Sequence, residues 1–284
     1  MSQPKVYIII LNYKGKSDTL DCLESVHRNG YPAYHVVVVD NASHDGAPEA
    51  VRAAWPGDLV VENSENLLYA EGNNVAIRLA LEDPEAKYIL LLNNDTVVAP
   101  DLVSELVKAM EADPAAGLGC PMIYYYPPKP EGRELIWYAG GIVELWKGLT
   151  AHRGIRETDT GAYSKVEETG YVTGCAMMIR RSCAERTGLL DPSYGMYAED
   201  ADYSLRAARA GFRLLFIPSG RVWHKVSVSA GGEFSWFKLK RKARASLLLL
   251  WRYAPAWGWL TIPFFLTARV VGFVVRRLMR RLMR

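Results

Sequence analysis

The chain of 284 residues is long enough to bury a full core in one large or two small domains. Half of its residues are hydrophobic, 23% are charged and the formal net charge is +3, which excludes a disordered protein and gives no overall case for nucleic-acid binding. The first apolar run, residues 6–11, is too short for a secretory signal. The four cysteines are scattered along the chain: Cys22, Cys120, Cys175 and Cys183. This spacing favours free thiols in a reducing compartment, so we expect the main folded part in the cytoplasm.

Apolar runs that end in polar residues alternate with helical patterns in the first third of the chain. Residues 6–11 form the first expected strand, and the segments at 36–39, 59–61 and 90–92 repeat its character. Helical spacing of apolar residues follows the first strand and recurs at 75–81. Strands that are apolar on both faces and alternate with helices indicate a parallel sheet with right-handed crossovers. Such a sheet binds ligands at the carboxyl ends of its strands.

The rest of the chain has a looser pattern. In order, it predicts a helix at 101–110, a strand at 118–126, a mixed segment at 136–146, a buried strand at 171–179, a helix at 199–210 and two short strands at 213–217 and 221–224. Gly174 and Cys175 interrupt the buried strand, where a residue without a side chain lets a substrate approach the backbone. Gly211 ends the second helix, and Pro218 marks a turn between the short strands.

The fourth expected strand ends abruptly in Asn93, Asn94, Asp95 and Thr96. Side chains alternate along a strand, so Asn93 and Asp95 point the same way from the end of the sheet. An amide and a carboxylate there suit a hard cation that carries phosphate oxygens. The alternative is a simple turn in which Asp95 or Thr96 caps the helix near Pro100.

Polar residues also follow the second strand and precede the helix at 75–81. Asp40 ends a strand of four valines, where its carboxylate can accept hydrogen bonds from a base or ribose, or cap the helix near Pro48. The amides of Asn66, Asn73 and Asn74 either contact a bound nucleotide and hold a loop closed, or simply form turns.

Two adjacent carboxylates, Glu199 and Asp200, open the helix at 199–210. A helix N-terminus favours ionised carboxylates, so a general base placed there stays deprotonated at neutral pH. The alternative is ordinary acidic first-turn chemistry. His224 ends the last strand and is either a cation ligand beside Asp95 or a structural histidine.

Six motifs keep a specific order and spacing along residues 5–226. They are Val37-Val38-Val39-Asp40-Asn41-Ala42-Ser43, Glu65-Asn66 with Gly72-Asn73-Asn74, Leu91-Leu92-Asn93-Asn94-Asp95, Gly174-Cys175-Ala176-Met177, Glu199-Asp200-Ala201-Asp202 with Arg206, and Trp223-His224. As a set they resemble family 2 inverting glycosyltransferases, especially the rhamnosyltransferase-like branch.

The resemblance implies an α/β fold of GT-A type, with a mainly parallel, Rossmann-like sheet flanked by helices. It implies a catalytic domain at residues 1–230, with a nucleotide-sugar-binding half at 1–115 and an acceptor-binding half at 116–230. The implied reaction moves a sugar from a nucleotide-diphosphate sugar, dTDP-rhamnose or a UDP-sugar, to a hydroxyl of a cell-surface glycan or lipid-linked acceptor. A divalent cation, Mg²⁺ or Mn²⁺, is the implied cofactor.

Each motif implies a role for particular residues. Asp40 is similar to the residue that contacts the nucleotide base, and Asp95 to the metal-binding end of an Asp-X-Asp motif. His224 matches a histidine that is the third metal ligand in part of the family. Asn93 departs from the usual Asp of this motif, which lowers the negative charge of the site. The other implied nucleotide-sugar contacts are Asn12, Tyr13, Asn41, Asn66, Asn73, Asn74 and Asn94.

The Glu-Asp motif implies the base of a single displacement with inversion. Asp200 matches the usual base, and Glu199 stays open as the alternative. The carboxylate would take a proton from the acceptor hydroxyl as that oxygen attacks the anomeric carbon. Acceptor contacts are expected at Gly174, Cys175 and Arg206.

Residues 231–284 form a basic, aromatic extension. The segment at 234–253 predicts a cationic helix, and 256–275 has the length to cross a membrane, although a proline and an arginine interrupt it. From Val271 apolar residues share one helical face and arginines the other, typical of a helix lying on anionic lipid. We expect the protein at the cytoplasmic face of the cell membrane; packing on its own domain or in a homodimer is the alternative.

Two rival functions remain open. A sugar-nucleotide nucleotidyltransferase shares this kind of sheet but needs a glycine-rich, basic phosphate loop after the first strand, and residues 12–16 are a poor substitute. The other rival is an inactive sugar-nucleotide-binding membrane scaffold. Metal-dependent chemistry on the donor would separate that scaffold from a transferase.

Overall fold

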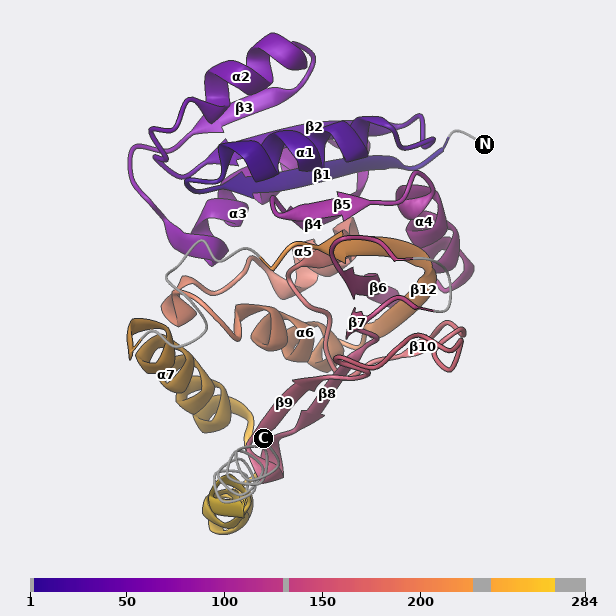
Figure 1. Cartoon of the computed structure of the whole chain (residues 1–284). Helices are drawn as coiled ribbons and strands as arrows, with labels where there is room; N and C mark the ends of the chain where they lie inside the picture. The colour runs from indigo at the N-terminus through magenta and orange to yellow at the C-terminus, as the bar shows by residue number, and fades with distance from the viewer. Residues whose placement is uncertain (1–2, 130–132, 227–235, 269–284) are drawn as a thin grey trace, which may run out of the picture.

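A sheet of ten strands forms the centre of the molecule, with the strand order β10-β12-β6-β11-β4-β1-β2-β3 and with β5 and β7 at its side (Figure 1). A computed structural model describes residues 3–129, 133–226 and 236–268. The expected amphipathic segment from Val271 therefore lies outside the described residues, as does the end of the segment at 256–275.

The first half of the sheet is parallel, as the alternation of strands and helices predicted. Its strands are β1 (Lys5–Asn12), β2 (Tyr34–Asp40), β3 (Leu59–Glu62) and β4 (Ala86–Asn93). The connecting helices are α1 (Lys16–His27), α2 (Ala47–Ala54) and α3 (Leu68–Glu82). Strand β1 pairs with β2 and β4, and β3 pairs with β2, all in parallel. The central apolar residues of β1 and β4 are fully buried, because helices cover the sheet.

The second half makes the sheet mixed. Its elements are β5 (Thr96–Val98), α4 (Leu102–Ala112), β6 (Ala116–Tyr125), β7 (Ile136–Tyr138), β11 (Ala176–Arg180), α5 (Arg181–Thr187), the 3₁₀ turn η2 (Pro192–Tyr194), α6 (Glu199–Arg209) and β12 (Arg213–His224). Strand β11 lies between β4 and β6 and runs antiparallel to both. This reversal puts Gly174 and Cys175, which precede β11, beside the carboxyl end of β4.

Two strand predictions were wrong in extent. Residues 171–175 are not a strand, because α6 takes part of their hydrogen bonding: Val172 N–H donates to Ser204 Oγ and Gly174 N–H to Asp200 Oδ2. The expected short strands at 213–217 and 221–224 are one strand, β12. A register shift between Ile217 and Arg221 absorbs the proline between them, so pairing with β6 continues on both sides.

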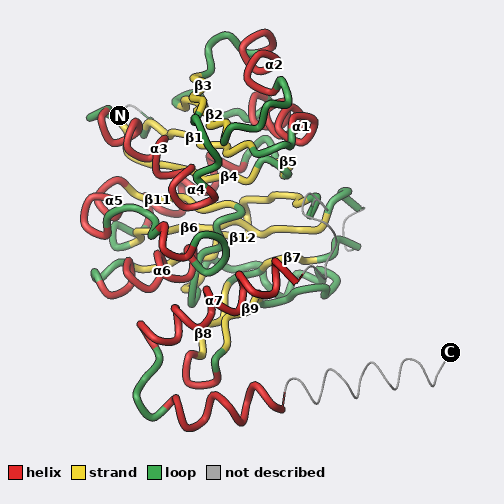
Figure 2. The backbone as a smooth tube through the Cα atoms, turned by 90° about the vertical axis from the view of Figure 1, so that its left-hand side faces the viewer, coloured by secondary structure: helices red, strands yellow, loops and turns green. Residues whose placement is uncertain are grey.

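The remaining elements lie on the side of the molecule away from the parallel half of the sheet. Strands β8 (Gly141–Glu144) and β9 (Leu149–His152) form a hairpin joined by the 3₁₀ turn η1 (Leu145–Lys147), while β10 (Glu167–Glu168) pairs with β12. The predicted cationic helix is α7 (Trp236–Tyr253), and residues 258–268 are also helical. Thr261 Oγ1 donates to the carbonyl of Trp146 at the hairpin tip. Figure 2 shows these helices at the opposite end of the molecule from β3 and α2.

None of the helices in the described ranges combines the length and hydropathy needed to cross a bilayer.

Candidate active site

Asp40 is anchored at the carboxyl ends of β1 and β2. The strand register places Asn12 beside it, and Asn12 Nδ2 donates to Asp40 Oδ1 over 2.6 Å and to Ser43 Oγ over 3.0 Å. The N–H of Ser43 donates to the second Asp40 oxygen over 2.9 Å. Helix α2 begins without a side-chain cap, so the alternative in which Asp40 caps the helix near Pro48 is wrong. The carboxylate instead organises the loop after β2.

The amide oxygen of Asn12 fixes the loop between β1 and α1. It accepts from Gly15 N–H over 3.1 Å and from Thr19 Oγ1 over 2.9 Å. Asn94 Nδ2 donates to the same threonine hydroxyl over 3.0 Å. A Cβ on Gly15 would lie 2.5 Å from Asn94 Nδ2, so any larger residue there would displace the Asn94 amide. The tips of β1 and β4 are thus joined, and the ring of Tyr13 stays exposed beside them.

Asn41 and Asn66 hold the segment that leads into α3. Asn41 Nδ2 donates to the carbonyl of Leu68 over 3.1 Å, and Asn66 Oδ1 accepts from the N–H of the same residue over 2.9 Å. Leu68 has a φ of 61°, a left-handed conformation that a leucine adopts only when its surroundings impose it. The two amides therefore shape the rim of the edge formed by β2.

Three other expected contact residues have their side chains engaged within the protein. Asn73 and Asn74 lie buried inside α3; Asn73 bonds a carbonyl one turn earlier, and Asn74 exchanges bonds of 2.9 and 3.0 Å with the backbone of Leu190. Arg206 donates to two backbone carbonyls between α5 and η2, over 2.8 and 2.9 Å. These contacts stabilise loops around the site, and ligand binding by these three residues stays a prediction.

Asp95 and His224 meet at the same edge of the sheet. They come together because β12 pairs with β5, which places His224 opposite Thr96. His224 Nε2 lies 3.1 Å from Asp95 Oδ1, and the edge of Trp137 packs against the imidazole. Burial alone would lower the pKa of His224, but the adjacent Cys175 and the hydrogen bond to Asp95 raise it to about 10. The residues at 94 and 95 do form a turn, yet neither Asp95 nor Thr96 caps α4.

The Asp95 carboxylate and the His224 imidazole would hold a divalent cation only after His224 loses the proton that its raised pKa favours, because a ligating imidazole is neutral. Adjacent ligands of an octahedral cation with bonds of ~2.1 Å lie about 3.0 Å apart, close to the separation of the two side-chain atoms. Within the described ranges, no group of three or more His, Cys, Asp or Glu side chains converges on one point.

Gly174 and Cys175 lie between that pair and α6. The N–H of Asn93 donates to the carbonyl of Cys175 over 2.9 Å, which joins this segment to β4. Tyr69 OH donates to the carbonyl of Gly174 over 2.6 Å, and a Cβ on Gly174 would lie 2.6 Å from that hydroxyl oxygen. Glycine is required here by the approach of Tyr69. Tyr69 was not predicted as a site residue, because it precedes the helix expected at 75–81; the structure places it in the first turn of α3.

Asp200 presents its carboxylate to this same segment from the N-terminus of α6. Its Oδ2 accepts from Gly174 N–H over 3.0 Å and its Oδ1 from Ala201 N–H over 2.8 Å. Tyr197 and Ala198 precede the helix with φ values of 76° and 65°, and no side chain caps it. Consecutive left-handed residues without glycine are costly and typical of functional sites. The strained turn brings Asp200 to Gly174.

Glu199 and Asp200 differ in their surroundings. Glu199 is buried, its Oε2 has no hydrogen-bond partner within the described part of the chain, and burial together with the charge of Asp200 raises its pKa to about 8. Burial also raises the pKa of Asp200, but the N–H groups of Gly174 and Ala201 favour its ionised form. Of the two, Asp200 is the one suited to accept a proton at neutral pH.

A family model described as "Glycosyl transferase family 2" matches residues 7–188. The chain is 27% identical over 216 residues to N-acetylglucosaminyl-diphospho-decaprenol L-rhamnosyltransferase of Mycobacterium tuberculosis, which covers 70% of this chain and 68% of that protein. It is 24% identical over 226 residues to rhamnosyltransferase WbbL of Escherichia coli, covering 77% and 83% of the two chains.

Two solved structures share the fold. GalNAc-T7 with UDP, GalNAc and Mn²⁺ superposes with a TM-score of 0.70 and 18% identity, over 90% of this chain and 49% of that one. The mannosyltransferase PcManGT of Pyrobaculum calidifontis, in complex with GDP-Man and Mn²⁺, gives a TM-score of 0.62 and 20% identity, over 95% and 76%. The present chain thus spans about half the length of the first of these. The expected GT-A fold is confirmed.

Proposed function

Because the chain belongs to glycosyl transferase family 2, we propose that this glycosyltransferase moves a sugar from a nucleotide-diphosphate sugar to an acceptor hydroxyl with inversion at the anomeric carbon. One arrangement carries the proposal. The Asp95–His224 pair and the Asp200 carboxylate flank the Gly174–Cys175 segment at the carboxyl ends of the strands. This arrangement supports a leaving-group site on one side of that short backbone stretch and a base on the other.

The nucleotide would lie over β1, β2 and β4. Asp40 and Asn12 form the floor of this edge, Tyr13 offers an exposed ring for stacking, and the amides of Asn41 and Asn66 shape the rim. Asp95 and His224 would hold Mg²⁺ or Mn²⁺. When bound, that cation supplies positive charge against the diphosphate leaving group.

Asp200 performs the proton transfer. Its carboxylate, oriented by two backbone N–H donors, accepts the proton of the acceptor hydroxyl as that oxygen forms its bond to the anomeric carbon. The bond from the same carbon to the diphosphate oxygen breaks on the opposite face, and the diphosphate leaves with the bonding electron pair. Glu199 carries a proton at neutral pH, which leaves the charge of the pair on Asp200.

The names of the relatives support a deoxysugar donor and a lipid-linked acceptor. Rhamnosyl transfer to a polyprenyl diphosphate carrier is named for the Mycobacterium tuberculosis relative, and rhamnosyl transfer for the Escherichia coli one. We therefore propose dTDP-rhamnose as the first donor to test, with UDP-sugars as the second. The acceptor proposed is a hydroxyl of a lipid-linked, cell-surface glycan precursor.

The C-terminal helices support attachment to the cytoplasmic face of a membrane. Large apolar side chains are exposed along residues 247–266: Leu247, Trp251, Trp257, Trp259, Leu260, Phe264 and Leu266. Tryptophans favour the boundary between lipid headgroups and hydrocarbon, and the exposed Lys240, Lys242 and Arg244 of α7 would face anionic headgroups. An acceptor with a lipid anchor would be available at that surface. A homodimer formed through the same face is the alternative occupant.

A transfer assay with purified full-length chain tests the proposal. Radiolabelled dTDP-rhamnose or a UDP-sugar is offered with a polyprenyl-diphosphate GlcNAc acceptor, with Mn²⁺ or with EDTA. We expect a product of opposite anomeric configuration that forms only with the cation. Pyrophosphate release from a nucleoside triphosphate and a sugar 1-phosphate would instead identify a nucleotidyltransferase. Donor binding without turnover of any acceptor would identify the scaffold.

A further inference from the structure

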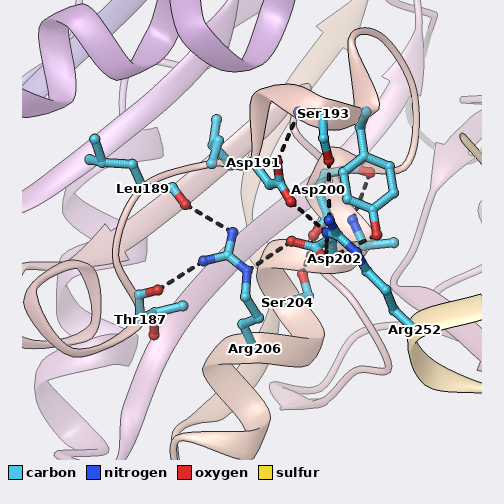
Figure 3. Close-up of polar contacts among 12 residues, drawn as sticks. Thr187, Leu189, Asp191, Ser193, Asp200, Asp202, Ser204, Arg206 and Arg252 are labelled. Atoms are coloured by element: carbon cyan, nitrogen blue, oxygen red, sulfur yellow. Dashed lines mark hydrogen bonds and ion pairs between the residues drawn. The ribbon is translucent and has the colours of Figure 1, made fainter. Parts of the chain in front are cut away.

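The third carboxylate on α6, Asp202, contacts side chains from α6, η2 and the end of α7. It is fully buried and follows Asp200 by two positions. Figure 3 shows it between Arg206 on its own helix and Arg252, which comes from the last turn of α7. Neither the proton transfer nor the cation site uses this residue, so its surroundings need another explanation.

The carboxylate of Asp202 receives four donors from different parts of the chain. Its Oδ1 accepts from Tyr253 OH over 2.7 Å and from Tyr194 OH over 3.0 Å, and it lies 3.3 Å from an Arg252 nitrogen. Its Oδ2 accepts from Arg206 Nε over 2.8 Å. Burying a carboxylate costs free energy unless it is paired with a positive charge and fully hydrogen-bonded. The four donors meet both conditions for Asp202.

The end of α7 is fixed by more than this carboxylate. Arg252 also contacts Asp191 over 2.5 Å and Ser193 Oγ over 3.2 Å, and its guanidinium stacks on the ring of Tyr194. The guanidinium of Arg209 lies 4.4 Å from the ring centre of Tyr253. Side chains from α6 and η2 therefore hold the last two residues of α7 in place through hydrogen bonds, ion pairs and ring contacts.

Two of the three carboxylates of α6, those of Asp200 and Asp202, lie on opposite faces of the helix. Successive helical residues are rotated by about 100°, so Asp200 and Asp202 project roughly 160° apart. Asp200 faces Gly174, and Asp202 faces Tyr253. The N-terminus of α6 has no side-chain cap and follows two strained residues, so these two contacts add to the hydrogen bond between Ser204 and Val172 in fixing its position.

We propose that Asp202 is a positioning residue: through Tyr253 and Arg252 it ties the C-terminal helix α7 to α6, and so holds Asp200 against Gly174. This rests on the proposed role of Asp200 as the base. The C-terminal extension is then part of the catalytic unit as well as a surface for membrane attachment. Loosening the tie should slow proton transfer and leave donor binding at β1, β2 and β4 unchanged.

The test compares two variants with a matched control. Tyr253→Phe removes one donor to Asp202 and keeps its charge pairing, and Asp202→Asn removes the charge. Tyr7→Phe deletes the same kind of bond, Tyr7 OH to Asp83 Oδ2 at 2.8 Å, on β1 away from α6. Steady-state transfer gives kcat and the donor KM. Hydrogen exchange gives the protection of the backbone amides at 171–176 and 199–205.

For Tyr253→Phe we expect kcat to fall by about tenfold, the scale of a hydrogen bond to a charged group, with the donor KM within about twofold. The amides at 171–176 and 199–205 should exchange faster in Tyr253→Phe than in the wild type. Asp202→Asn should show a larger loss of kcat and a larger increase in exchange than Tyr253→Phe. Tyr7→Phe should match the wild type. Unchanged exchange in both peptides for Tyr253→Phe would overturn the proposal. So would a folded Tyr253→Phe that loses donor affinity and keeps kcat.

Failure of the proposed function gives a different pattern. If the wild-type chain transfers no sugar, the exchange measurement still decides whether Asp202 and Tyr253 hold the segment at Gly174. If Asp202→Asn does not fold, Tyr253→Phe decides alone, since it removes a single oxygen atom.

Discussion

His224 Nε2 lies 3.1 Å from Asp95 Oδ1, although the two residues are 129 positions apart in the chain. The contact forms because β12 pairs with β5, the short strand that follows the turn at the end of β4. The separation suits two neighbouring ligands of one cation, and both side chains are largely buried. A buried pair of this kind has little room to rearrange, so each residue should be needed for cation binding.

Replacing either member of this pair should remove the cation-dependent part of donor binding. We expect UDP or dTDP with Mn²⁺ to raise the Tm of the wild type by several degrees, and Asp95→Asn or His224→Gln to abolish the increment that Mn²⁺ adds. Asp58→Asn is the control, because Asp58 forms a similar pair with His27 over 2.8 Å elsewhere in the fold. A full Mn²⁺ increment in Asp95→Asn would contradict the assignment.

Removal of the base should slow chemistry far more than it weakens binding. Asp200→Asn keeps the size of the side chain but cannot accept the proton, so kcat should fall by about 10²–10⁴-fold with little change in donor KM. Glu199→Gln should retain most of the activity, because Glu199 is already protonated at neutral pH. The opposite result for the two variants would make Glu199 the base.

Glu199 should lower the stability of the fold at alkaline pH. Its pKa is raised to about 8 in the folded chain, so its contribution is most favourable at pH values below its unfolded pKa and is lost as the pH rises towards 8. Glu199→Gln cannot ionise and should avoid this loss. We expect its Tm to exceed the wild type by about 5 °C at pH 9 and to match it near pH 4.5. Equal differences at both pH values would argue against a buried, neutral Glu199.

Gly174 and Tyr69 should behave as a coupled pair. Gly174→Ala places a methyl group 2.6 Å from the Tyr69 hydroxyl oxygen and should reduce both Tm and kcat, because the segment that meets Asp200 must move. In a double-mutant cycle with Tyr69→Ala, which removes the obstructing ring, the two losses should not add. Gly30→Ala is the control, since a Cβ there meets no atom within 4 Å. Strict additivity would exclude the steric explanation.

The exposed apolar residues near the C-terminus should bind lipid. Vesicles of phosphatidylcholine and phosphatidylglycerol should retain the wild-type chain. The triple variant Trp257→Ala, Leu260→Ala, Phe264→Ala should bind them about tenfold or more weakly, because it loses three exposed apolar side chains that would enter the lipid. Leu59→Ala, an exposed leucine on β3, should have no effect. A concentration-dependent dimer that the triple variant abolishes, without vesicle binding by the wild type, would favour self-association.

The parallel half of the sheet was largely predictable from the order of residues alone. Apolar runs that are buried on both faces and end in polar residues specify parallel strands and the edge where their side chains meet, and β1, β2 and β4 follow that pattern. The strand boundaries in the mixed half of the sheet were harder to predict. The proline in β12 looked like a turn, and the reach of the strand at β11 depended on hydrogen bonds that α6 takes from residues 171–175.

The sequence by itself determined the strand that ends in Asp40, the strand that ends just before Asp95 and the helix that begins with Glu199 and Asp200, because periodicity and local turn chemistry act over a few residues. Only the tertiary structure decided which of these side chains meet. The antiparallel insertion of β11 places Gly174 between the Asp95–His224 pair and Asp200. Tyr69 contacts that glycine from α3, and Asp202 contacts the end of α7. These contacts depend on pairing and packing between distant segments, which no local pattern encodes.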